Sequence, residues 1–188
     1  MKNLSVAVSN VKGGVGKTSL ALALAYTFSD HLGHNIDYRT NDPFGPKPME
    51  RRRDAAEINV AILDYGGFEP VGKKGGEAAE LLNEVDYLLV PVRYDGLSLV
   101  AGKSILAKRE KSRSTFVIGT ECSQKDCGIL QAALGYEVFR FRHSTASPSI
   151  LTENRSPYEI AGENSLLTYS WKGWFNDVQA IAGKILDE

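Results

Sequence analysis

The sequence predicts one α/β domain, with a doubly wound, mainly parallel sheet and helices on both faces. Three observations predict it: strand-like and helix-like apolar runs alternate along the chain, a glycine-rich loop separates the first strand from the first helix, and a later strand is apolar until it ends in an aspartate. With 188 residues, the chain suits a single domain over 1–188 that buries about 70% of its unfolded surface.

The first strand, in which Leu4, Val6 and Val8 alternate with smaller residues, leads into a helix predicted over 19–28. The loop between them departs from the usual Gly-x4-Gly-Lys-Ser/Thr pattern, because Val11 stands where the first glycine is expected. Glycines let backbone N–H groups converge on phosphate oxygens, and the helix N-terminus adds a favourable dipole. A turn with solvated lysines is the alternative. We expect a nucleotide-phosphate site made of Gly13, Gly14, Val15, Gly16, Lys17, Thr18 and Ser19.

Three side chains carry the expected phosphate and metal chemistry. Lys17 can reach the β- and γ-phosphates, and Thr18 supplies a hydroxyl for Mg²⁺. Because the carboxyl ends of parallel strands meet beside such a loop, Asp64 is expected to hold Mg²⁺ through water. Gly66 or Gly67 is then placed to bring a backbone N–H to the γ-phosphate.

The run from Lys12 to Thr18 resembles the deviant Walker A motif of the ParA/MinD group of P-loop ATPases. In that family Lys17 matches the ordinary phosphate lysine, and Lys12 matches the signature lysine that reaches the partner's phosphates in a nucleotide-sandwiched dimer. The resemblance implies ATP and Mg²⁺ as cofactors, an ATP-dependent homodimer, and hydrolysis of ATP to ADP and phosphate that is slow without a partner. It extends over nearly the whole chain and is strongest to small ParA-type partition ATPases, since no DNA-reading module is expected ahead of the first strand.

The dipeptide Asp42-Pro43 follows the second predicted strand, where the family has Asp-X-Asp-Pro-Gln. The resemblance makes Asp42 the carboxylate that positions the attacking water, so the implied catalytic residues are Lys12, Lys17 and Asp42. A plain turn is the alternative. Thr40 and Phe44 replace the first aspartate and the glutamine, which leaves the hydrolysis rate open.

The rest of the chain continues the alternation of strands and helices. A surface loop and a short helix are expected over 43–54, and a glycine-rich basic loop over 68–76. Further strands are predicted over 34–41, 59–64, 85–92, 115–119 and 137–142, and helices over 77–83, 97–111, 124–134 and 164–186. In the family, a loop that flanks the adenine leads into a turn that Arg155–Tyr158 matches, which implies that this segment, with Pro157, belongs to the nucleotide-binding site.

DNA binding by this chain would need a local basic patch, because 22 basic and 23 acidic residues give a net charge of −1. Neutralising phosphates requires such a patch and no base-reading element. Stabilisation of a helix C-terminus explains several of these cations equally well. The candidates are Lys103, Lys108, Arg109, Lys111, Arg113, Arg140 and Arg142.

The leading hypothesis is a ParA-type ATPase for partition of plasmid or chromosomal DNA, or for cargo positioning. Its expected partners are non-specific DNA and a centromere-binding or adaptor protein that stimulates hydrolysis. The alternative is a MinD-like membrane-surface ATPase. The acidic end of the last helix disfavours it, because helices that lie on membranes have a cationic polar face. An iron protein of the nitrogenase type is disfavoured because Cys122 and Cys127 are close together; we expect them to be structural or incidental. Without a signal or a membrane-spanning run, a cytoplasmic location is expected, nucleoid-associated when ATP is bound.

Overall fold

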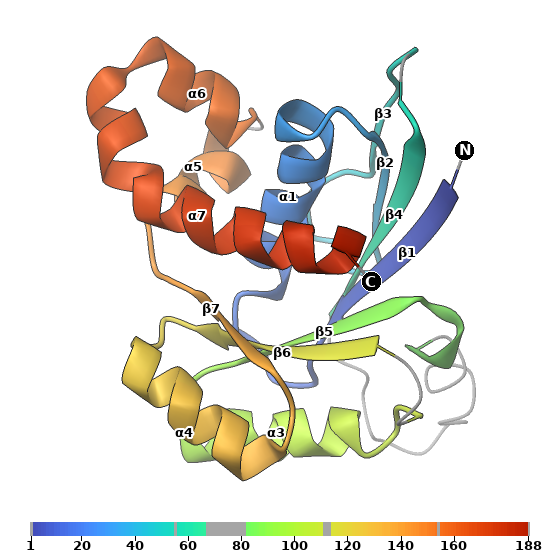
Figure 1. Ribbon diagram of the computed structural model, residues 1–188, viewed down its shortest axis with the longest axis vertical. Helices are drawn as coiled ribbons and strands as arrows, with labels where there is room; N and C mark the ends of the chain where they lie inside the picture. Colours follow the sequence, from blue (N-terminus) through green and yellow to red (C-terminus); the bar gives the residue numbers. More distant parts are fainter. Residues whose placement is uncertain (1, 55, 67–81, 111–113, 154, 188) are drawn as a thin grey trace.

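The computed structural model describes residues 2–54, 56–66, 82–110, 114–153 and 155–187. Within these residues, seven strands form one sheet in the order β3-β2-β4-β1-β5-β6-β7 (Figure 1). Every neighbouring pair is parallel except β2 and β3, which are antiparallel. The strands are β1 (Lys2–Ser9), β2 (Asn35–Thr40), β3 (Met49–Arg51), β4 (Ile58–Tyr65), β5 (Tyr87–Val92), β6 (Ser114–Thr120) and β7 (Val138–Phe141).

Helices cover both faces of the sheet, which confirms the predicted doubly wound fold. In Figure 1, α1, α5, α6 and α7 lie on one side and α3 and α4 on the other. The helices are α1 (Lys17–Tyr26), continued by a π-helical turn η1 (Thr27–His31), α3 (Gly96–Leu106), α4 (Gln124–Leu134), α5 (Ala146–Glu153), α6 (Pro157–Glu163) and α7 (Ser165–Asp187).

Two hydrophobic cores follow from the period of two along the central strands. In β1, Leu4, Val6 and Val8 belong to the core beneath α1 and α7, whereas Ala7 belongs to the core beneath α3 and α4. The helix α1 is buried along its length from Leu20 to Tyr26 because it lies between the sheet and the helices α5 and α7. The phosphate loop is therefore held between a central strand and a central helix.

The last helix, α7, docks on the sheet through one face. Its buried side chains recur at spacings of three and four residues and face α1 and β7. They include both tryptophans, Trp171 and Trp174, which are almost fully buried. No helix of the described residues is long and apolar enough to cross a membrane.

The short helix expected within 43–54 is wrong, because this segment contains the edge strand β3, which pairs with β2. Its Arg51 donates to Asp30 at 2.7 Å and lies over the Tyr26 ring, 4.9 Å from the ring centroid. Because the Asp30 side chain is almost fully buried, its charge requires a cation, and the strand β3 places Arg51 beside it. The loop predicted over 68–76 and most of the helix over 77–83 lie outside the described residues.

Candidate nucleotide-binding site

The loop from Asn10 to Gly16 leaves β1 at the carboxyl end of the sheet, between β4 and β5. Asn10 is fully buried and anchors the loop on both sides. Its Nδ2 donates to the Pro91 carbonyl oxygen at 2.7 Å, and its Oδ1 accepts from the Lys12 N–H at 3.0 Å. Asn10 was not among the predicted site residues; the available signal was a polar residue directly after a buried apolar strand.

Two glycines give the loop a shape that exposes its backbone donors. Gly14 and Gly16 have φ values of 72° and 84°, in the left-handed region that L side chains rarely adopt. Gly16 is also the N-cap of α1 and provides no side chain to accept from the first-turn N–H groups. These donors and the helix dipole form an anion site where phosphate is expected.

A cavity of about 390 Å³ opens above this loop, and the side chains expected to act on phosphate line it. Lys17, Thr18 and Asp42 are among its lining residues, with Gly66 from the end of β4. The Lys17 Nζ donates to the Lys12 carbonyl oxygen at 2.9 Å. Burial lowers the pKa of Lys17, and the nearby charges of Asp64 and Asp42 oppose this shift. The geometry brings the predicted phosphate lysine, hydroxyl and switch carboxylate to one place.

Asp64 lies at the end of β4, almost fully buried, with a carboxylate oxygen that is unsatisfied within the described residues. Its Oδ2 accepts from the Tyr38 hydroxyl at 3.1 Å, whereas Oδ1 has no hydrogen-bond partner there. Burial raises its pKa, against the opposing effects of Thr18, Tyr38 and Lys17. A buried oxygen without a donor, beside the Thr18 hydroxyl, matches the hard oxygen ligands that Mg²⁺ prefers. The residues present therefore fit a Mg²⁺ site.

Asp42 is held by a tight turn immediately after β2. The Thr40 Oγ1 accepts from the Asp42 N–H at 3.1 Å, and one carboxylate oxygen of Asp42 accepts from the Phe44 N–H at 2.9 Å. Thr40, which replaces the family's first aspartate, thus shapes the turn that presents Asp42. Phe44 is 97% exposed and makes no comparable contribution with its ring.

Asn41 joins the two loops that flank the cavity, a role that sequence reasoning missed. Its Oδ1 accepts from the Gly66 N–H at 2.8 Å, and its Nδ2 donates to the Gly66 carbonyl oxygen at 3.4 Å. The Asn41 amide therefore bonds both backbone groups of Gly66 and links the ends of two neighbouring strands. Gly67, the other predicted γ-phosphate donor, lies outside the described residues.

Lys12 points away from this cavity, towards the start of α3. Its Nζ donates to both carboxylate oxygens of Asp95, at 3.0 and 3.1 Å, and to the Ser98 hydroxyl at 2.9 Å. Asp95 is the N-cap of α3 and accepts from the Ser98 N–H at 2.8 Å. The two loop lysines thus have separate surroundings in a single chain.

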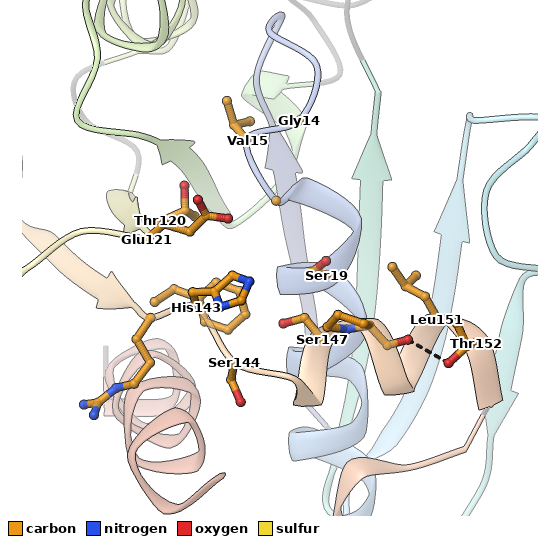
Figure 2. A pocket seen from close by; sticks show the side chains of 14 residues that line it. Gly14, Val15, Ser19, Thr120, Glu121, His143, Ser144, Ser147, Leu151 and Thr152 are labelled. Carbon is orange, nitrogen blue, oxygen red and sulfur yellow. Dashed lines mark hydrogen bonds between the residues drawn. The ribbon is translucent and has the colours of Figure 1, made fainter. Parts of the chain in front are cut away.

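A second cavity of about 430 Å³ adjoins the loop on its other side (Figure 2). Ser19 of α1 contributes to it, together with Glu121 after β6, His143 after β7, and α5. Figure 2 shows Glu121 and His143 on one side of Ser19 and Leu151 of α5 on the other. Pro157 does not line this cavity: it is buried in the first turn of α6, and its role beside the base stays a prediction.

The structure also removes Arg109 from the candidate DNA contacts. Arg109 is only 4% exposed, and its guanidinium donates to main-chain carbonyls, including those of Val85 at 3.0 Å and Asp86 at 3.2 Å. Because these bonds turn the chain back towards β6, α3 ends at Leu106 and not near residue 111. Arg109 is therefore a buried tether and cannot contact a phosphate backbone.

Two other arginines of that set are engaged with a buried carboxylate. Arg142 Nε donates to Asp177 at 2.7 Å, and Arg140 lies 3.4 Å from the same side chain. A Cβ on Gly173 would collide with the Arg142 guanidinium, so the missing side chain at Gly173 lets Arg142 pack against α7. Lys103 and Lys108 are exposed. Lys111 and Arg113 lie outside the described residues.

The first strand of this parallel sheet enters a buried helix through this loop, with Lys17 and Asp42 lining the cavity above it and Asp64 near the end of the neighbouring strand β4. This arrangement defines the P-loop nucleotide-binding class of folds. No protein-family model matches the sequence, and no curated protein is similar to it. Among solved structures, the MinD cell division protein of Aquifex aeolicus is similar over 98% of each chain, with 11% identity and a TM-score of 0.68.

Two further solved structures have the same arrangement. The pNOB8 ParA protein matches over 98% of each chain, with 11% identity and a TM-score of 0.63. The ATP complex of a Cyanothece McdA variant matches over 98% of this chain and 96% of McdA, with 10% identity and a TM-score of 0.63. The chain thus has the fold of the ParA/MinD group of deviant Walker A ATPases, as the motif resemblance predicts.

Proposed function

We propose that this protein is an ATP-driven switch of the ParA type, which binds ATP with Mg²⁺, dimerises and hydrolyses the nucleotide slowly without a partner. The supporting observation is the gathering of Lys17, Thr18 and Asp42 around one cavity, with the unsatisfied Asp64 carboxylate beside it. The ATP complex of McdA shows that this fold accommodates the nucleotide in that protein.

Each of these residues has a defined task in the proposal. Lys17 exchanges the Lys12 carbonyl for the β- and γ-phosphate oxygens, since a charged acceptor makes the stronger hydrogen bond. Thr18 and, through water, Asp64 would hold Mg²⁺, which would supply positive charge beside the phosphates. The second oxygen of Asp42 orients the attacking water, while the first remains bound to the Phe44 N–H. Lys12 acts across the dimer.

We assign the switch to positioning of DNA or another cargo. Lys103 and Lys108 are exposed on and after α3, where lysines can make sequence-independent phosphate contacts. In the MinD-like alternative, an amphipathic helix lies on the membrane; here the apolar face of α7 packs on the sheet. MinD occurs in a complex with MinC, and by analogy we expect an adaptor protein that stimulates hydrolysis.

Mass measurement in solution tests this proposal. With ATP and Mg²⁺ the protein is expected to run as a dimer, and with ADP as a monomer. Lys17→Ala should lose nucleotide binding by at least about tenfold, because the phosphate charge loses its partner. Lys12→Ala should bind ATP and stay monomeric. Dimerisation by Lys12→Ala at the parent affinity contradicts the assignment of Lys12.

A further inference from the structure

The ammonium group of Lys12 is saturated within its own chain. An ammonium has three N–H donors, and here it meets three acceptor atoms: two oxygens of Asp95 and the Ser98 hydroxyl. Ser98 in turn donates to Asp95 at 2.7 Å and is fully buried, so the acceptors form one small network. Lys12 must leave this network before it can reach another molecule.

Asp95 is held in place independently of Lys12. It caps α3 by accepting from the Ser98 N–H at 2.8 Å. Hydrogen bonds from the backbone and side chain of Ser98 lower the pKa of Asp95, and those from Lys12 add to this effect. The carboxylate is therefore ionised at neutral pH and already oriented towards the loop.

The same residue is linked to the phosphate cavity through its main chain. The Lys12 N–H donates to Asn10, and its carbonyl oxygen accepts from Lys17. When phosphate oxygens draw the Lys17 ammonium away, the Lys12 carbonyl loses that hydrogen bond. The main-chain contacts of Lys12 with Asn10 and Lys17 are thus separate from the contacts of its ammonium with Asp95 and Ser98.

We propose that Asp95, supported by Ser98, is a positioning residue that holds Lys12 within its own chain and opposes transfer of the ammonium to the phosphates of a second copy. This inference rests on the proposed function of Lys12. Because the two side chains are 30% and 40% exposed, solvent screens the pair and its effect is modest. Asp95 then adjusts how readily the dimer forms, without deciding whether it can form.

Asp95→Asn is the appropriate variant, because asparagine is an equally good N-cap but lacks the charge that attracts Lys12. With ATP and Mg²⁺, its dimer dissociation constant is expected to fall about twofold to fivefold. Asp126→Asn is the matched control: Asp126 belongs to the capping box of α4, and its carboxylate contacts Ser123 rather than a loop lysine. This control should leave the dissociation constant unchanged.

A second readout follows Lys12 itself in the nucleotide-free monomer. The rate of acylation of the Lys12 amine, measured by peptide mass spectrometry with Lys103 as the internal reference, should rise about twofold to fivefold in Asp95→Asn. A protein whose Asp95 only caps α3 would show no such rise. An unchanged labelling rate therefore overturns the inference.

The dimer measurements separate the two proposals. If the parent dimerises with ATP and Asp95→Asn has the same or a weaker affinity, Asp95 does not oppose transfer and only the inference fails. If the parent and Asp95→Asn both remain monomeric with bound ATP, the proposed function fails and the inference falls with it. Dimerisation of Asp95→Asn alone supports both.

Discussion

At the scale of single residues, Asp64 destabilises the nucleotide-free fold but lies where Mg²⁺ is expected. Its side chain is buried, one oxygen has no hydrogen-bond partner among the described residues, and burial raises its pKa above the ordinary 3.8. Asp64→Asn should therefore stabilise the nucleotide-free protein by on the order of 1 kcal/mol, as measured by chemical denaturation. Mg²⁺-dependent ATP binding should weaken on the order of tenfold or more, because the carboxylate is lost.

The pH dependence of this effect has a defined sign. A raised folded-state pKa means that the native carboxyl keeps its proton where the unfolded one has lost it, so Asp64 destabilises the fold increasingly as pH rises above 3.8. The advantage of Asp64→Asn should grow over that range and level off once the native carboxyl has ionised. An advantage that shrinks with rising pH contradicts the assigned pKa direction.

At the same scale, the carboxylates could be predicted better than the amides. Asp42 and Asp64 lie at the carboxyl ends of strands that follow a phosphate loop, and parallel strand ends converge, so their position beside the loop was expected. Asn10 and Asn41 act through backbone groups of residues 81 and 25 positions away, and nothing local marks those partners. A polar residue at a strand end is common in any loop.

At the scale of elements, the packing of α4 on β6 depends on a glycine. Helix α4 has the predicted bounds, because Ser123 forms a capping box at its start and Gly135, with φ 73°, ends it. Beneath it, a Cβ on Gly119 would lie 2.8 Å from the Cys127 sulfur. Burial also raises the pKa of Cys127 and that of Cys122, the latter to about 11, so both thiols stay protonated at neutral pH.

Gly119→Ala should destabilise the protein by about 1–3 kcal/mol, because the added methyl group collides with the Cys127 sulfur. In the double variant Gly119→Ala/Cys127→Ala the loss should be smaller than the sum of the two single losses, since removing the sulfur makes room. Chemical denaturation measures all three. The control is Gly128→Ala on the exposed face of α4, where a Cβ meets no atom within 4 Å; it should be neutral or slightly stabilising. Strict additivity argues against a steric role for Gly119.

At the scale of the whole molecule, a net charge of −1 leaves any DNA binding to local surfaces. The fold narrows the candidates: Arg109 is a buried tether, and Arg140 and Arg142 are paired with Asp177. The exposed lysines on and after α3 remain.

Lys103→Glu/Lys108→Glu should weaken binding of the ATP-bound protein to DNA of any sequence. The slope of log affinity against log salt should fall by about 0.9 for each DNA phosphate that the variant no longer neutralises. A salt titration measures this slope. Lys172→Glu, an exposed lysine of α7, is the charge-matched control and should behave as the parent does. An unchanged slope in the double variant would place DNA elsewhere.

The sequence by itself determined the fold class, the phosphate loop and the strand-end carboxylates. These features depend on local periodicity, on glycine conformations, and on the rule that parallel strand ends meet at one edge. Only the tertiary structure decided which cations are exposed, which residues line the second cavity, and that Lys12 contacts Asp95. The reason is physical. The sequence identifies each charged side chain, but the partner of that side chain and its access to solvent depend on segments that are far apart in the chain. Lys12 and Asp95, for example, are separated by 83 positions.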